Sequence, residues 1–418
     1  MALPQSGKRV VGLYAGWGNF ERAARRAGMK VLASYERDRT AVDFHRAGLL
    51  VTGEDTPDHV YLADVTQLAS IPECDIVVAG IPCQPFSPER AGQQLGMEDE
   101  RGAPLWEATA RLAASGKAKV VVVENVDEAK GPAQSVGAAI FAKYGFRYCQ
   151  IHVLPASAFG SLQERKRMWA TFSVFPMEWD VTEYVTGPRP LSDFLLTVED
   201  FDDDWEAYRA ALEPCYVGLG TLRMLIRKQV EETKRGFGLY AVPIDYRGII
   251  GALTKNYWKT GGSAPLLADR CLRCGYQVSR MDSWMYFTVV DGQAGLDKDI
   301  GEDGLRYPAH LLCGDCIETL REEGLDFSGH LMPQVRTYLH QRLQAGATSV
   351  RRYHPIEGLR MLDMPENLPY PDSLGKAFQL LGNSLHVGTA TAVLKAVDRA
   401  WPATKGYQMS LWELDPVA

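Results

Sequence analysis

The 418-residue sequence contains no run of about 18 apolar residues, and its start, MALPQSGKRV, has no apolar signal segment. We therefore expect an intracellular, cytoplasmic protein with no membrane partner. Internal repeats and low-complexity tracts are missing, and the net charge of −7 is small and negative. This charge argues against a protein that coats nucleic acid without specificity, although a local basic groove is compatible with it.

Cysteine is scarce, and half of it is paired. Of eight cysteines, four form the motifs CLRC and CGDC, at Cys271, Cys274, Cys313 and Cys316. In a cytosolic chain such pairs favour metal binding over disulfides, and four thiolates leave no open coordination position. We predict a structural Zn²⁺ site. The alternative is two reduced and unrelated pairs, because the gap between the pairs is longer than usual.

The pattern of apolar runs predicts an α/β fold with an insertion. Residues 1–172 alternate strands such as DIVVAG and VVVVENV with helical stretches, as a doubly wound, mainly parallel, Rossmann-like sheet requires. This regularity fails over 173–345, which we interpret as an irregular α+β domain. The α/β pattern returns in 346–418, with a helix at IEGLRMLDMP and a turn at LGNSL that runs into a long helix. We infer that this segment rejoins the first domain.

Charge is segregated inside the irregular domain. Residues 191–213 carry eight acids against Arg209 alone, whereas 219–260 carry eight lysines or arginines against three acids. The basic stretch is suited to an anionic polymer, or equally to a solvated helix face balanced by the acidic segment.

The motif GIPCQPFS follows a predicted strand and places Cys83 where an α/β sheet presents its chemistry. Pro82 and Pro85 restrict the backbone on both sides, because proline fixes φ. This is the geometry of a nucleophile. A buried, inert thiol is the commoner fate of a single cysteine and is the alternative here.

A second motif, GLYAGWGNF, places Gly16 and Gly18 between a strand and a helix, where glycine lets the backbone approach a ligand. Glu36 closes a strand about twenty residues later, where a ribose hydroxyl is bound in Rossmann-like sheets. Asp64 is suited to an adenine amino group, and Tyr14 to stacking. The complete GxGxxG phosphate cradle is missing, so S-adenosylmethionine fits better than a dinucleotide.

Further polar residues follow the remaining strands. VVVVENV delivers Glu124 and Asn125 at its carboxyl end, where a buried carboxylate is either functional or capped by Asn125 and backbone donors. In FGSLQERKRMWA, the alternation of Gln163, Arg165 and Arg167 predicts one shared face of an extended segment, suited to a carboxylate or phosphate. An exposed sheet edge is the alternative.

These motifs in this order resemble the cytosine carbon-5 DNA methyltransferase family. GIPCQPFS resembles its nucleophile loop, ENV its second catalytic motif, QERKR its QxRxR motif, GLYAGWGNF its cofactor turn and LGNSL its final motif. The resemblance covers roughly 1–172 and 346–400. Two positions depart from it, since Gly12 stands where the family usually has Asp and Asn19 where it has Gly.

The resemblance implies a set of site residues. Cys83, Glu124, Arg165 and Arg167 would be catalytic, with Cys83 adding to carbon-6 of a flipped cytosine, Glu124 at ring nitrogen 3, Arg165 orienting the base or Glu124, and Arg167 supporting the loop or a phosphate. The implied substrate contacts are Gln84, Ser87, Asn125 and Gln163. The implied S-adenosylmethionine contacts are Tyr14, Gly16, Gly18, Glu36, Asp64, Val65, Pro82, Asn383 and Ser384.

The expected partner is double-stranded DNA with a specific target sequence, bound by a monomer of prokaryotic or viral origin in which 173–345 recognises the target. Two alternatives stay open. The segment IGALTKNYWKTGGSAP is faintly similar to tRNA-methylating members and would fit an RNA substrate. A catalytically silent, zinc-containing nucleic-acid binder would keep the fold without the chemistry.

Overall fold

A computed structural model describes most of the chain outside the irregular domain. The residues it describes are 6–87, 95–99, 101–217, 241–243, 246, 248–254, 257, 266–271, 273–274, 284–290, 293–296, 310–325, 338, 341–342 and 350–402. The basic stretch at 219–260 and the segment at 250–265 lie largely outside these residues.

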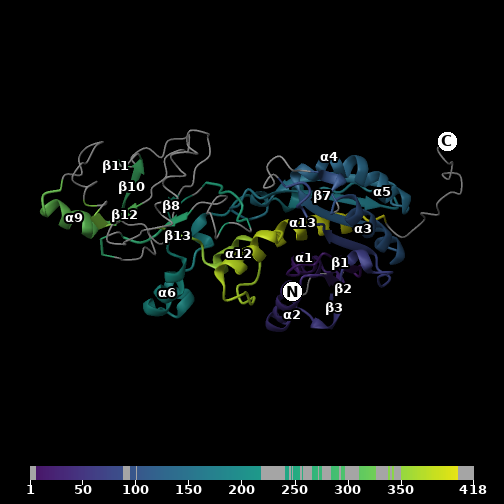
Figure 1. The fold of residues 1–418 in the computed structure, drawn as a ribbon, viewed down its shortest axis with the longest axis horizontal. Helices are drawn as coiled ribbons and strands as arrows, with labels where there is room; N and C mark the ends of the chain where they lie inside the picture. Colours follow the sequence, from purple (N-terminus) through teal and green to yellow (C-terminus); the bar gives the residue numbers. More distant parts are fainter. Residues whose placement is uncertain are drawn as a thin grey trace.

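A seven-stranded sheet forms the larger part of the molecule, in the order β3-β2-β1-β4-β5-β7-β6 (Figure 1). Its strands are β1 (Arg9–Leu13), β2 (Lys30–Glu36), β3 (Val60–Leu62), β4 (Ile76–Gly80), β5 (Val120–Val126), β6 (Tyr148–Pro155) and β7 (Lys166–Ser173). Only β7 runs antiparallel to its neighbours in this sheet. The winding reverses between β1 and β4, and ligands bind at the carboxyl ends of strands at such a reversal. The predicted α/β sheet is confirmed.

Both faces of this sheet are covered by helices, because its strands are apolar on both sides. Val10, Val78 and Val122 belong to one buried cluster, while their neighbours Val11, Val77 and Val121 belong to another. The helices of this part are α1 (Asn19–Arg26), α2 (Arg39–Thr52), α3 (Ala103–Ser115), α4 (Lys130–Pro132), α5 (Ala138–Lys143), α11 (Pro355–Met361), α12 (Leu374–Asn383) and α13 (Val387–Arg399).

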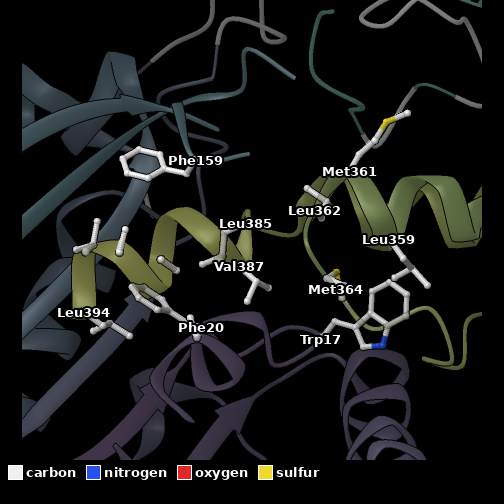
Figure 2. Close-up of a cluster of buried hydrophobic side chains, with 14 of the residues drawn as sticks. Trp17, Phe20, Phe159, Leu359, Met361, Leu362, Met364, Leu385, Val387 and Leu394 are labelled. Atoms are coloured by element: carbon white, nitrogen blue, oxygen red, sulfur yellow. The ribbon is translucent and has the colours of Figure 1, made fainter. Parts of the chain in front are cut away.

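The C-terminal segment packs against the first helix of the chain. In Figure 2, Val387 and Leu385 lie beside Phe20 of α1, and Met364 lies beside Trp17. The predicted helices correspond to α11 and α13. The prediction of a turn across LGNSL was wrong for its first three residues, because they form the last turn of α12 and only Ser384–His386 connect it to α13.

Within its described residues, the second part of the molecule contains two small three-stranded sheets and the helices α6 and α9 (Figure 1). One sheet has the order β11-β10-β12 and the other β13-β9-β8. The strands are β8 (Ala241–Pro243), β9 (Leu266–Ala268), β10 (Trp284–Val290), β11 (Gln293–Leu296), β12 (His310–Cys313) and β13 (Val350–Arg351), and the helices are α6 (Trp205–Leu212) and α9 (Gly314–Glu322). Irregular α+β character was predicted here and is observed in the described residues.

A buried ionic network joins the two parts. The Arg351 guanidinium on β13 donates from Nη1 and Nη2 to the Glu357 carboxylate of α11, at 2.7 and 2.8 Å. Its Nε donates to Asp269, which also accepts a hydrogen bond of 2.7 Å from the Tyr216 hydroxyl. Arg351, Asp269 and Glu357 are each at most 1% exposed. Buried charges of this kind are tolerated only when paired, so the network fixes the junction.

Among the described residues, no helix is both long enough and apolar enough to cross a membrane.

Candidate active site

The predicted nucleophile lies on a tight loop after β4, the central parallel strand between β1 and β5. The Cys83 carbonyl accepts hydrogen bonds from the amides of Phe86 and Ser87, both at 2.9 Å. The Asn125 side chain of β5 donates to the Ile81 carbonyl at 3.1 Å, which fixes the start of the same loop. Cys83 is only partly buried. Its thiol is therefore held on a loop fixed at both ends.

Glu124 emerges at the carboxyl end of β5 and pairs with Arg167 of β7. The distance from Arg167 Nε to Glu124 Oε1 is 3.1 Å, and the Glu124 side chain is 13% exposed. Burial raises the pKa of the Glu124 carboxyl, while Arg167 and Arg165 act in the opposite direction. A raised pKa favours the protonated form of the carboxyl, which can donate a hydrogen bond to a ring nitrogen.

Arg165 and Gln163 tie three segments of the chain together, and no hydrogen bond joins either side chain to Glu124 among the described residues. Arg165 donates to the Leu253 carbonyl at 3.2 Å, to the Gly382 carbonyl at 2.9 Å and to the Ser384 carbonyl. The Gln163 Oε1 accepts from the Leu253 amide at 3.0 Å. Arg165 thus sits between the second part of the molecule and the C-terminal segment, whereas Arg167 makes the direct contact with Glu124.

The cofactor turn, residues 14–18, has an unusual backbone. Tyr14 has φ of 56°, a left-handed value that costs a tyrosine roughly 1 kcal/mol or more. Gly16 and Gly18 also have positive φ, at 53° and 82°. A Cβ at Gly18 would overlap the His45 imidazole, so glycine is required there for space as well. The Tyr14 hydroxyl donates to the Leu105 carbonyl at 3.0 Å and holds the ring in place.

Two acids flank this turn. Glu36 at the end of β2 accepts hydrogen bonds from the amides of Gly16, Arg37 and Asp38, at 3.0, 2.8 and 2.8 Å. Asp64 follows β3 and accepts from the amide and hydroxyl of Thr66, which lower the pKa of its carboxyl. Both carboxylates are therefore oriented before any ligand is present.

Helix α12 supplies the opposite wall of the site. Asn383 is its last residue, and the Ser384 hydroxyl donates to the Leu380 carbonyl at 2.9 Å. Lys376, Gln379 and Leu380 line the same cavity and were missed by the sequence reasoning. Together with Asn383 they fall at helical spacing on one face, a signal that would have found them had α12 been predicted.

One cavity of about 420 Å³ brings the predicted residues together. Cys83, Gln84, Glu124, Arg165 and Arg167 line it, together with Tyr14, Gly16, Glu36, Asp64, Val65, Pro82, Asn383 and Ser384. The buried Gln84 Oε1 has no hydrogen-bond partner among the described residues. Gly18, Ser87, Asn125 and Gln163 are outside this lining, although Ser87 and Asn125 make hydrogen bonds that fix the Cys83 loop.

The departure at Asn19 has a structural use. Its side-chain amide donates to the Leu385 carbonyl at 3.0 Å and to the Met364 sulfur at 3.1 Å, and the residue is 4% exposed. A glycine at this position could make neither contact. Asn19 therefore connects the cofactor turn to the C-terminal segment.

The four paired cysteines converge in the second part of the molecule. Cys271 and Cys274 follow β9, Cys313 ends β12, and Cys316 lies in the first turn of α9. Their sulfur atoms all lie within 4.8 Å of one another, and Cys274 Sγ is 3.7 Å from Cys313 Sγ. Four sulfurs at about 2.3 Å from a tetrahedral Zn²⁺ would be about 3.8 Å apart, so the donor set fits that ion.

Comparison with known proteins identifies the family. The family model for C-5 cytosine-specific DNA methylase matches residues 8–172. Type II methyltransferase M.NlaIV of Neisseria lactamica is 36% identical over 141 residues, which are 31% of this chain and 32% of that protein. Six of the relatives are matched over only 25% to 41% of their own length.

Two further similarities extend along almost the whole chain. An Entamoeba histolytica methyltransferase, EhMeth, has a similar fold, with a TM-score of 0.59 at 12% identity over 94% of this chain and 98% of that one. Type II methyltransferase M.BanI of Aneurinibacillus aneurinilyticus is 31% identical over 431 residues, covering 93% of this chain and 95% of that protein. The chain belongs to the C-5 cytosine-specific DNA methylase family.

Proposed function

We propose that this protein transfers a methyl group from S-adenosylmethionine to carbon-5 of cytosine in double-stranded DNA. The observation that carries the proposal is the single cavity lined by Cys83, by the Glu124–Arg167 pair and by the two acids that flank the cofactor turn. Its volume is in the usual range for ligand sites. Among relatives, the similar Type II methyltransferases support DNA as the substrate.

The cofactor residues of this chain fit an adenosine with a cationic tail. Glu36 would accept from ribose hydroxyls, Asp64 from the adenine amino group, and Tyr14 would contact the ring. Asn383 and Ser384 would close the site from α12. When bound, S-adenosylmethionine supplies the methyl group as a sulfonium.

Cys83 would act as the nucleophile. Its thiolate forms a bond to carbon-6 of the cytosine, and the electrons of the C5–C6 double bond become available at carbon-5, which takes the methyl group. The carbon-5 proton then leaves, and its electron pair restores the double bond as the Cys83–C6 bond breaks. Glu124 would donate a hydrogen bond to ring nitrogen 3 and hold the exocyclic amino group, which drains charge from the ring as the adduct forms.

Arg167 would hold Glu124 in place, and Arg165 would position the segments around the base. A cytosine inside a duplex cannot reach Cys83, so the base must be flipped out. Gln84, whose buried oxygen has no partner among the described residues, would contact the flipped nucleotide.

Bisulfite sequencing of DNA from cells that express the protein tests this function and reveals the target sequence. We expect methylated cytosines at one recurring sequence, and none with a Cys83→Ser variant. Transfer of labelled methyl groups to tRNA but not to duplex DNA would contradict the choice of substrate. Failure to form a covalent complex with 5-fluorocytosine-containing DNA would contradict the mechanism.

We also propose that the four cysteines hold one structural Zn²⁺ within a target-recognition domain at 173–345. The support is the convergence of four sulfurs within 4.8 Å. Elemental analysis of the purified protein should find one zinc per chain. A protein free of metal that nevertheless retains its full thermal stability would contradict this proposal.

A further inference from the structure

A buried acid follows the cofactor turn in the chain and has no role in the chemistry described above. Glu21, in the first turn of α1, is 0% exposed. Neither of its carboxyl oxygens has a hydrogen-bond partner in another described residue. An unpaired buried carboxylate is costly, and such groups cluster at functional sites. Burial accordingly raises the pKa of Glu21 to about 7.

Gly12 on β1 makes room for this carboxyl. A Cβ at position 12 would lie 2.7 Å from Glu21 Cδ and 3.0 Å from Cγ, and would overlap the carboxyl oxygen. Gly12 is a strand residue without positive φ, so its backbone conformation does not require glycine. The Glu21 carboxyl therefore occupies the space that a side chain at position 12 would need.

Positions 12 and 21 carry the opposite residue types from those that the two motifs would predict. In a G-x-G-x-x-G turn that starts at Gly16, position 21 would be the third glycine, which allows close packing of helix on strand. Here the helix carries the acid and the strand carries the glycine. The Glu21 carboxyl of α1 therefore lies beside position 12 of β1, where the family resemblance leads us to expect an acid.

The charged side chains near Glu21 pair with other groups, so they leave the Glu21 carboxyl without a partner in another described residue. Arg22 and Arg25 of its own helix pair with Glu54 and Asp55, at 2.9 and 3.2 Å. The Glu36 carboxylate of β2 adds negative charge and accepts from the Gly16 amide. His45 of α2 stands against Gly18, and burial keeps its pKa well below the ordinary value, so it is neutral.

We propose that Glu21 is a positioning residue for the cofactor, which supplies negative charge behind the cofactor turn and strengthens binding of the cationic S-adenosylmethionine. This inference rests on the proposed function, because it assumes that the cavity binds this ligand. Binding of the cation favours the ionised form of Glu21, so affinity should rise with pH. If binding lowers the pKa of Glu21 by one unit, Kd falls about fivefold between pH 6 and pH 8.

The test is calorimetric titration of the full-length protein with S-adenosylmethionine, without DNA. Glu21→Gln should weaken binding several-fold at pH 8 and remove the rise in affinity between pH 6 and pH 8. Asp43→Asn is the matched control, since it removes the same charge from an exposed position on α2, and it should change neither. The double variant Gly12→Asp/Glu21→Ala returns a carboxylate to the strand and should recover most of the affinity at pH 8.

The outcomes separate this inference from the proposed function. If the unaltered protein fails to bind S-adenosylmethionine at any pH, the proposed function itself is wrong. If it binds, and Glu21→Gln keeps the same affinity and pH dependence while remaining folded, Glu21 has no part in cofactor binding. Loss of affinity in Glu21→Gln without recovery in the double variant would overturn the equivalence of the two positions.

Discussion

The cavity and the cysteine cluster are held in place by different means. The cavity lies at the edge of a sheet whose two faces are buried in large apolar clusters, and its polar groups are fixed by contacts from segments far apart in the chain. The four cysteines lie between two short three-stranded sheets. Apolar burial is distributed over many residues, whereas a metal site depends on four. The two regions should therefore fail separately.

Within the cavity, one substitution should separate methyl transfer from cofactor binding. Cys83→Ser should lower methyl transfer at least about 1000-fold, because removal of a nucleophile leaves only the contribution of binding. Its hydroxyl cannot replace the thiolate, but its size preserves the loop. The measurements are labelled-methyl transfer and S-adenosylmethionine affinity. The variant should bind the cofactor normally, and a variant with residual activity within tenfold would refute the nucleophile assignment.

Removal of metal should affect the other region alone. Structural Zn²⁺ contributes on the order of 10 kcal/mol in small domains, so a strong chelator should unfold the cysteine region and abolish specific DNA binding. S-adenosylmethionine binding should persist, since the cavity shares no residue with the cluster. Limited proteolysis with and without chelator measures this. Cys149→Ser, which removes an exposed cysteine outside the cluster, is the control, and it should respond to the chelator as the unaltered protein does. Equal loss of cofactor binding would show that the regions are not independent.

Disruption of the buried ionic network between the two parts of the molecule should have the next largest effect. Arg351→Met leaves Asp269 and Glu357 buried without their cation, which should lower the free energy of unfolding by about 3–5 kcal/mol. Arg189→Met removes an arginine from a more exposed pair with Asp193 and should cost at most about 1 kcal/mol. Denaturant titration of both variants gives the difference. Similar values for the two would mean that Arg351 contributes no more than a surface pair.

The sheet, and the positions of polar residues at the ends of its strands, could be predicted from the sequence because both follow from local pattern. Continuous apolar strands such as β5 and the residues that directly follow them, Glu124 among them, need no knowledge of distant contacts. Cys83, Glu36 and Asp64 line one cavity because the carboxyl ends of parallel strands meet at one edge of the sheet.

What the sequence could not predict depends on partners far away in the chain. Arg165 and Arg167 occupy equivalent positions in the alternating pattern of the sequence. Yet Arg165 donates to the main-chain carbonyls of Leu253 and Ser384, whereas Arg167 pairs with Glu124. Only the fold decides which arginine meets the acid. The core likewise continues beyond residue 172, because Trp179, Leu191 and Phe194 pack in the same cluster as β1 and α13.

The Glu21→Gln substitution should have the smallest of these effects, and the sign of its change in the free energy of unfolding is the most informative. Its folded pKa of about 7 lies above its ordinary value of 4.5, so the folded protein holds a proton that the unfolded chain releases. The stability of the unaltered protein relative to Glu21→Gln should therefore fall as pH rises from about 5 to 7 and then level off.

At pH 8 the Glu21→Gln protein should be more stable by on the order of 3 kcal/mol, although it binds S-adenosylmethionine less well. Thermal unfolding from pH 5 to pH 8 without ligand measures this. A variant less stable than the unaltered protein at pH 8 would show that the carboxylate has a stabilising partner. A more stable but weaker binder would show that the acid is retained for the ligand at the expense of the fold.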